Sequence, residues 1–254
     1  MRALLRLRLY SVGRQVNDSL TRLMPRERAR IGRMMALYGM FISPGQVVFD
    51  VGANVGNRTA LFVRLGARVV AAEPQSVCVH HLRKRFGSNA SVSIVAMAVG
   101  RTAGTAEMHV SQAHVISSLS PDWLASVQGT RRFGVHGWDQ TETVTVTTLD
   151  ALIQQYGAPA FCKLDVEGFE SEVLAGLSRT VPALSFEYTP EYAANTTRCV
   201  ARLSELGNYE YNYDVGEAMK LELPKWVGPD EIGDAVRSVS HSTFADIYAR
   251  LRRA

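Results

Sequence analysis

Cysteine is scarce in this sequence, and no apolar run is long enough to cross a membrane. Cys78, Cys162 and Cys199 form no Cys-x-x-Cys pair and no cluster with histidine at zinc spacing. We therefore predict neither a disulfide framework nor a structural zinc site, and the pattern is typical of a reducing cytoplasm. A membrane-spanning helix needs roughly 20 uninterrupted apolar residues, which no segment offers. The sequence thus predicts a soluble, cytoplasmic protein.

Acidic residues are nearly absent from the N-terminal part of the chain. Before Gly45 there are nine arginines against only Asp18 and Glu27, a net charge of +7. Since the whole chain carries +4, the remainder sums to −3 (4 − 7), which argues against a nucleic-acid partner for the whole protein. Apolar residues near helical spacing between positions 4 and 16 favour a basic amphipathic helix. We interpret residues 1–42 as a basic helical arm packed on a domain of residues 43–254; contact with a membrane surface or an anionic partner is the alternative.

The rest of the sequence alternates between short β-branched runs and helical segments. The 254 residues are 46% apolar and 20% charged, as in an ordinary globular enzyme. Such alternation predicts a mostly parallel sheet with helices on both faces, closed by an antiparallel pair of late strands. Residues 111–137 are predicted to form a long loop or lid. The predicted strands cover residues 47–51, 68–72, 92–96, 106–110, 143–147, 161–166, 183–188, 209–213 and 244–248, and the predicted helices cover residues 59–65, 76–86, 149–156, 170–177 and 197–206.

The fingerprint Gly-x-Gly-x-x-Gly is absent, yet the first strand runs into a glycine turn at residues 50–56. Gly52 permits backbone angles closed to other residues and lets a ligand approach the main chain. Ligands of open α/β sheets bind at the carboxyl ends of such strands. The carboxylate of Asp50 would repel a pyrophosphate but suits an ammonium group, directly or through water. We therefore predict a cofactor that is zwitterionic at one end rather than a dinucleotide.

Glu73 ends the second predicted strand and is followed by Pro74. An acidic residue about 20 residues after the glycine turn can accept hydrogen bonds from both hydroxyls of a ribose. A surface carboxylate at a strand end is the alternative. The spacing between Glu73 and the glycine turn favours the cofactor-binding role.

Two separate groups of motifs resemble the FkbM family of methyltransferases. One is the glycine turn, and the other follows the strand predicted at residues 161–166. The resemblance spans roughly residues 38–192. In chain order, the resembling segments read Asp50-Val51-Gly52-Ala53-Asn54-Val55-Gly56, Thr148-Leu149-Asp150, Leu164-Asp165-Val166-Glu167-Gly168-Phe169-Glu170, Val173-Leu174-x-Gly176 and Phe186-Glu187-Tyr188.

This resemblance implies a Rossmann-like class I methyltransferase fold with a mostly parallel seven-stranded sheet. It also implies S-adenosyl-L-methionine as the cofactor, and methyl transfer typically to a hydroxyl of a polyketide, sugar or glycan-like acceptor. The stretch of residues 96–99 would lie beside the adenine, where a backbone contact replaces the acidic residue found in many such folds. The implied cofactor-binding residues are Asp50, Gly52, Asn54 and Gly56 on the methionine side, Glu73 at the ribose and Ala98 beside the adenine.

Asp165 and Glu167 are the candidate catalytic residues. They stand at the end of a predicted strand, where alternation points both side chains to one face of the sheet. A hydroxyl acceptor must lose a proton, and a carboxylate can take it if burial or a negative neighbour raises its pKa. The alternative is that these carboxylates cap the following helix or pair with Lys163. A magnesium site that also includes Glu187 is conceivable, but no histidine joins these residues and their spacing follows no octahedral pattern, so we predict no metal.

The predicted lid holds further candidates. His114 and His136 are alternative bases, although a loop histidine is more often simply exposed to solvent. Trp123, Phe133 and Trp138 either line an acceptor pocket or anchor the lid to the core.

Other functions stay open at this stage. Methylation of an amine or an RNA nucleoside is one alternative, and the RNA version requires the basic arm to bind phosphate. A non-catalytic binding module that keeps the fold is another. We expect a small-molecule or glycan acceptor and no nucleic acid as the partner.

Overall fold

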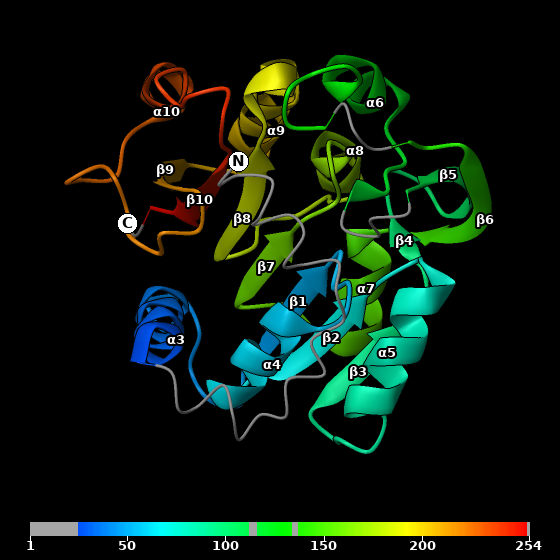
Figure 1. Ribbon diagram of the computed structural model, residues 1–254. Coiled ribbons are helices and arrows are strands. Elements are labelled where there is room, and N and C mark those ends of the chain that lie inside the picture. Colours follow the sequence, from blue (N-terminus) through cyan, green and yellow to red (C-terminus); the bar gives the residue numbers. More distant parts are fainter. Residues whose placement is uncertain (1–24, 112–115, 134–136, 253–254) are drawn as a thin grey trace.

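The computed structural model describes residues 25–111, 116–133 and 137–252 (Figure 1). The larger sheet contains β1 (Val47–Val51), β2 (Arg68–Ala72), β3 (Val92–Val95), β7 (Phe161–Leu164), β8 (Ala183–Tyr188), β9 (Tyr209–Val215) and β10 (Ala245–Leu251). The smaller sheet contains β4 (Ala98–Val99), β5 (Gly104–Val110) and β6 (Gln140–Thr147). The helices are α3 (Pro25–Tyr38), α4 (Asn57–Arg64), α5 (Ser76–Phe86), α6 (Pro121–Val127), α7 (Leu149–Tyr156), α8 (Glu170–Ala175), α9 (Ala193–Leu206), α10 (Pro229–Val236) and the 3₁₀ turn η2 (Pro190–Tyr192).

The larger sheet has seven strands in the order β3-β2-β1-β7-β8-β10-β9. The first five strands of this order pair in parallel, whereas β10 runs antiparallel to both β8 and β9. The mostly parallel seven-stranded sheet and its antiparallel closing pair are confirmed. The Rossmann-like fold predicted from the sequence is therefore the fold of the protein.

The strand order reverses at β1. The chain runs from β1 outward to β2 and β3, then crosses back to place β7 on the other side of β1. Loops that leave the carboxyl ends of two such strands diverge, and ligands of open α/β sheets bind between them. The register pairs Val51 with Leu164, so that Gly52 and Asp165, the next residues along each strand, lie side by side.

Helices cover both faces of this sheet (Figure 1). Because strand side chains alternate, neighbouring residues of β1 contribute to opposite faces. Phe49 packs into a cluster with Leu174 of α8 and other residues of α7, α9 and α10. Val48 packs on the other face with Tyr38 of α3 and Phe62 of α4. The carboxyl ends of the parallel strands, between these two apolar layers, position the site described below.

The smaller sheet follows the order β4-β6-β5, its β5–β6 pair is antiparallel, and β5 includes the strand predicted at residues 106–110. The segment predicted as an irregular lid contains helix α6. Pro121 occupies its first turn, and the Ser120 hydroxyl accepts the N–H of Trp123 at 3.1 Å. Proline and a hydroxyl cap are favourable at a helix start, which accounts for a helix where periodicity gave no signal.

Helix α3 lies within the predicted basic arm and packs directly on the sheet. Tyr38 is fully buried, and its ring contacts Phe62 and Phe161 at centroid distances of 5.1 and 5.6 Å. The amphipathic helix predicted between positions 4 and 16 lies outside the described residues. Within the described part of the chain, none of the helices combines the length and the apolar character that crossing a membrane requires.

Candidate active site

The turn after β1 is held by left-handed residues and by hydrogen bonds to the end of β2. Gly52, Asn54 and Gly56 have φ angles of 78°, 50° and 82°. The N–H of Gly52 donates to the carbonyl of Ala72 at 2.9 Å. Positive φ angles carry little strain in glycine, and asparagine tolerates them better than most residues. The sequence of the turn therefore matches its backbone.

A close approach explains why position 52 must be glycine. A Cβ atom at Gly52 would lie 1.8 Å from the carbonyl oxygen of Asp165. Sequence reasoning assigned this glycine to the approach of a ligand, whereas the neighbour found here is the end of β7. The glycine turn and the segment after β7, which are more than 100 residues apart in the chain, are thus in direct contact.

Glu73 anchors the turn from the end of β2. Its two carboxylate oxygens accept the N–H of Asn54 at 2.8 Å and the N–H of Gln75 at 2.9 Å. Only 3% of the residue is exposed, and burial raises its pKa to about 7 against these two hydrogen bonds. The side chain of Gln75 also hydrogen-bonds to this carboxylate. The predicted role at a ribose agrees with this chemistry and stays a prediction.

Asp50 lies in β1, two residues before Gly52. It is 1% exposed, and the hydroxyl of Thr59 donates to its Oδ2 at 2.6 Å. Burial raises the pKa of Asp50, opposed by that hydrogen bond and by the charge of Lys163. Its action on an ammonium group stays a prediction, and burial of the carboxylate would require that action to operate through water or at a distance.

Ala98 begins strand β4 and turns its methyl group into the smaller sheet. It packs with Met108, Val144 and Val146. Met97, just before it, is exposed. A contact with an adenine ring at this point would use the main chain of Ala98 or the side chain of Met97.

Asp165 follows the end of β7 and pairs with a buried lysine. Its N–H donates to the carbonyl of Val51 at 2.9 Å, which continues the pairing with β1. Its Oδ2 accepts a hydrogen bond from Nζ of Lys163 at 2.6 Å, while 40% of the Asp165 side chain is exposed. The ion pair considered from the sequence is thus present, and it leaves the other oxygen of Asp165 available.

Glu167 owes its orientation to a turn and not to strand alternation. Strand β7 ends at Leu164, two residues earlier than predicted, and Glu167 has a φ of 50°. Three contacts hold the turn. The Ser118 hydroxyl donates to the carbonyl of Glu167 at 2.6 Å, and the buried carboxylate of Glu170 accepts the N–H groups of Val166 and Gly168 at 3.2 and 3.3 Å.

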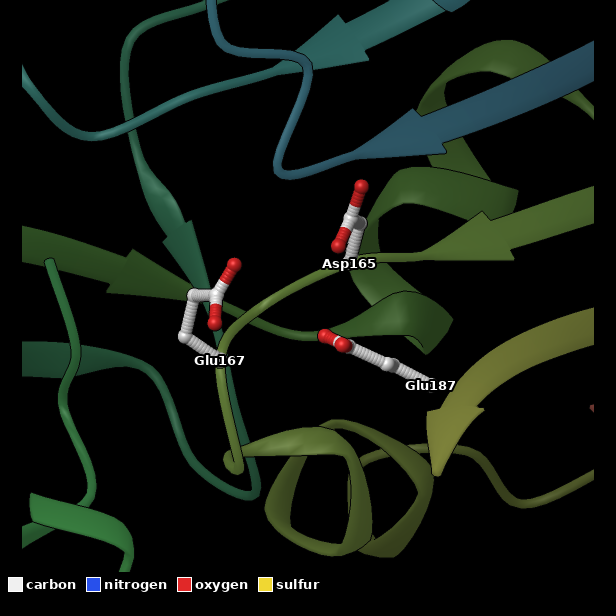
Figure 2. A group of neighbouring side chains, drawn as sticks. All are labelled: Asp165, Glu167 and Glu187. Atoms are coloured by element: carbon white, nitrogen blue, oxygen red, sulfur yellow. The ribbon is translucent and has the colours of Figure 1, made fainter. Parts of the chain in front are cut away.

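The side chains of Asp165, Glu167 and Glu187 converge, as Figure 2 shows. Carboxylate oxygens of the three lie within 4.8 Å of one another. Burial and the charges of Glu187, Asp165 and Glu170 raise the pKa of Glu167, and burial with Asp165 and Glu170 raises that of Glu187. Such a group attracts a cation or a shared proton.

The Methyltransferase FkbM domain matches residues 50–214, from the first residue of the glycine turn to the end of β9. The chain belongs to the FkbM methyltransferase family. One relative is the 31-O-demethyl-FK506 methyltransferase FkbM of Streptomyces tacrolimicus, which is 33% identical over 167 residues. That alignment covers 55% of this chain and 62% of the relative, so it spans less than two thirds of the relative's length.

Solved structures of other methyltransferases are similar at low identity. The precorrin-6y C5,15-methyltransferase of Geobacter metallireducens has a TM-score of 0.48 and 11% identity, with 91% of each chain covered. A putative rRNA methylase of Clostridium thermocellum has a TM-score of 0.47 and 8% identity, with 89% of this chain and 97% of that chain covered. At these scores the likeness says nothing about the substrate or cofactor of the FkbM-family chain.

The aromatic residues of the lid anchor it to the turn that carries Glu167. Trp123 is fully buried, with Phe133 at 5.5 Å and Trp138 at 6.2 Å between ring centroids. A Cβ atom on Gly168 would lie 2.4 Å from the Trp123 side chain, so that glycine is required for this packing. Of the two readings of these rings, anchoring is the one that the contacts support. The alternative bases His114 and His136 lie outside the described residues.

Glu187 was considered from the sequence only as a third ligand of a magnesium site, and Lys163 was not named among the site residues. Glu187 is on β8, and its neighbours on β7 become visible only once the strand order is known. Its membership of the FkbM-like segment Phe186-Glu187-Tyr188 was the signal that pointed to it. Lys163 appeared in the sequence only as a partner that would make Asp165 structural.

Proposed function

We propose that this FkbM-family chain transfers the methyl group of S-adenosyl-L-methionine to a hydroxyl of a sugar, glycan or secondary metabolite. The observation that carries the proposal is the contact of Gly52 with the carbonyl of Asp165. Because of this contact, a turn suited to a cofactor stands next to carboxylates suited to taking a proton. The Streptomyces relative is named as a methyltransferase of 31-O-demethyl-FK506, and O-methylation is the reaction type that we extend to this chain.

The donor set around the turn fits this cofactor. The carboxylate of Glu73 has about four acceptor positions, and the hydrogen bonds from the N–H of Asn54 and from the backbone and side chain of Gln75 leave room for a ribose hydroxyl. The negative charge of Asp50 suits the ammonium of a methionine moiety. The main chain of Ala98 and the exposed side chain of Met97 offer an adenine ring a surface without charge. When bound, the cofactor supplies a methyl group on a positively charged sulfur.

Glu167 is the base that we propose for the acceptor hydroxyl. Burial and the neighbouring charge of Glu187 raise its pKa, and a base works best when its pKa lies near the pH of operation. One oxygen of Glu167 takes the proton that the hydroxyl loses. Asp165 orients the acceptor through the oxygen that Lys163 leaves free, and it is the alternative base.

Two other functions compete with this proposal. An amine or RNA acceptor needs no change in the cofactor site, so only an acceptor screen separates it from a hydroxyl. A non-catalytic binding module could keep the same cofactor site, and the same screen separates it, since it would transfer no methyl group to any acceptor. We further propose a small-molecule or glycan acceptor, no nucleic-acid partner and a cytoplasmic location, and contact of the basic arm with a membrane surface stays the alternative to its packing on the domain.

Calorimetric titration of the purified full chain with S-adenosylmethionine, and separately with NAD, tests the proposal. Micromolar binding of S-adenosylmethionine alone is expected. Glu73→Ala should weaken it, whereas Glu205→Ala, which removes an exposed carboxylate on α9, should not. Binding of NAD, or of neither compound, would overturn the cofactor assignment. A screen with methyl-labelled S-adenosylmethionine against hydroxylated sugars, polyketides, amines and RNA then separates the acceptor classes.

A further inference from the structure

Lys163 is a buried lysine near the centre of the sheet. Only 2% of it is exposed. It lies on β7, two residues before Asp165. Its ammonium donates to Oδ2 of Asp165 at 2.6 Å, and the side chain of Asp165 reaches the surface. The ion pair therefore runs from the core of the sheet to the edge where the carboxylates converge.

The surroundings of Lys163 keep it charged. The register places Asp50 of β1 and Ser185 of β8 beside it, on the face covered by α3 and α4. Burial acts to lower the pKa of Lys163, but the charges of Asp165 and Asp246 outweigh burial and raise it. The titratable and charged groups that face it from the packed elements are Asp50, Asp165, Asp246, Tyr38 and Arg58.

Stability of the fold does not account for a lysine here. Phe161, Cys162 and Leu164, the other residues of β7, are buried and apolar. Replacing a buried ion pair with apolar residues of similar volume is often neutral or stabilising. The charge of Lys163 also acts beyond Asp165, since it lowers the pKa of Glu167. The effect of the Lys163 ammonium on the charge of the neighbouring carboxylates explains a cation at this position.

We propose that Lys163 is a positioning residue, whose ammonium fixes the carboxylate of Asp165 and offsets the negative charge that Asp165, Glu167 and Glu187 bring together. That these carboxylates serve methyl transfer rests on the proposed function. The effect of Lys163 on their charge does not, and it can be measured in the protein without cofactor or acceptor.

The test is a double-mutant cycle in which carbon-13 NMR measures the titration of the side-chain carboxyls. The variants are Lys163→Met, Asp165→Asn and the double variant, with Lys220→Met as the control for an exposed lysine. Glu167→Gln and Glu187→Gln assign the two resonances, which report a coupled pair. The charged groups that face this pair are Asp165, Glu170, Lys163, Asp246 and Arg132.

Opposite shifts are expected from the two single variants. Loss of the cation in Lys163→Met should raise the apparent pKa of the glutamate pair by about one unit or more, because the ammonium lies 2.6 Å from Asp165, whose carboxylate lies within 4.8 Å of the two glutamates, and opposite charges this close interact strongly in a partly buried site. Asp165→Asn should lower it, and the double variant should return close to the wild-type value. If Lys163→Met alone does not fold, the double variant compared with Asp165→Asn still isolates the ammonium and should show the higher pKa. Unchanged titrations, or shifts of the same sign in both single variants, would overturn the proposal.

A kinetic comparison connects the charge effect to the reaction once an acceptor is known. In Lys163→Met, kcat should fall at least tenfold at neutral pH, and the apparent affinity for S-adenosylmethionine should change less than threefold. Partial recovery of kcat at higher pH, where the glutamate pair loses its proton, is expected of a positioning residue. A loss of cofactor affinity that parallels the loss of kcat would make Lys163 structural.

Discussion

Glu73 occupies a position where its charge costs stability, because burial raises its pKa to about 7 and leaves the carboxylate partly ionised at neutral pH. Its two hydrogen bonds to backbone N–H groups shape the turn, but a neutral acceptor would also serve that purpose. An ionised, buried carboxylate with spare acceptor positions is best explained by a ligand that donates hydrogen bonds to it. This argument leads to a prediction about affinity.

Glu73→Ala should weaken binding of S-adenosylmethionine by about 1–3 kcal/mol, the usual cost of losing a charge-assisted partner. Calorimetry at pH 7.5 measures it, after circular dichroism has confirmed that the variant is folded. The matched control is Glu205→Ala, whose carboxylate is exposed on α9 and pairs only with Arg202 among the ion pairs of the described residues. Equal affinities for wild type and Glu73→Ala would remove Glu73 from the cofactor site.

Gly52 and Gly45 allow the close approach to β7 to be separated from the cost of backbone angles. Their φ angles are 78° and 83°, but a Cβ atom on Gly45 meets nothing within 4 Å. Gly45→Ala should therefore cost about 1 kcal/mol of unfolding free energy. Gly52→Ala should cost at least about 2 kcal/mol more, because the carbonyl of Asp165 must move. Urea unfolding monitored by fluorescence measures both, and equal costs would contradict the contact.

At the scale of helices and strands, segments with a clear apolar pattern were predictable from the sequence, and segments with only local signals at their ends were not. The bounds predicted for β1, β2, α5, α7 and β8 agree with the structure residue for residue. Helix α6 has seven residues and buries only Trp123 and Val127, too few to give a periodic pattern. Its signals were local, namely Ser120 as a cap and Pro121 in the first turn. Helix α10 was missed for a similar reason, since it begins at Pro229 within a long connection.

Contacts within the candidate site were likewise predictable only in part. The glycine turn and Glu73 are 20 or so residues apart and share one strand-helix unit, so spacing alone predicted that they meet. Glu187 meets Asp165 only because β8 lies next to β7, which is a property of the strand order. The left-handed φ of Glu167 depends on contacts with Ser118 and Glu170 and has no signature in the sequence.

Helix α3 allows the predicted start of the domain to be tested. The sequence placed the start at residue 43, yet Tyr38 is fully buried against Phe62 and Phe161. Tyr38→Ala should lower the unfolding free energy by about 3–5 kcal/mol, the range for removing a buried ring, and Tyr38→Phe by far less. A chain that begins at residue 43 should melt well below one that begins at residue 25. Equal melting temperatures would support the boundary predicted from the sequence.

At the scale of the whole molecule, the edge of the sheet concentrates buried carboxyls whose pKa values are raised. Burial raises the pKa of Glu73 and of Glu170 from 4.5 to about 7. Burial and the charge of Asp246 raise the pKa of Asp214, and burial with the charges of Asp165 and Glu217 raises the pKa of Asp246. In the folded state such groups hold protons that the unfolded chain has already released. Their contribution to stability is therefore complete below pH 4.5 and is lost as the pH rises toward 7.

Glu170 provides the clearest measurement of this effect, because its Oε1 accepts hydrogen bonds from the N–H groups of Val166 and Gly168 that the amide oxygen of a glutamine can retain. The free energy of unfolding of wild type should fall relative to Glu170→Gln by up to about 3 kcal/mol between pH 4.5 and pH 8. Urea unfolding at a series of pH values measures the difference. Glu172→Gln should show the opposite sign, since a hydrogen bond from Arg101 lowers the pKa of Glu172 and its contribution is lost as the pH falls. A difference between wild type and Glu170→Gln that is flat with pH would mean that Glu170 titrates alike in the folded and unfolded chain, and the turn that carries Glu167 would then be more open to water than its contacts indicate.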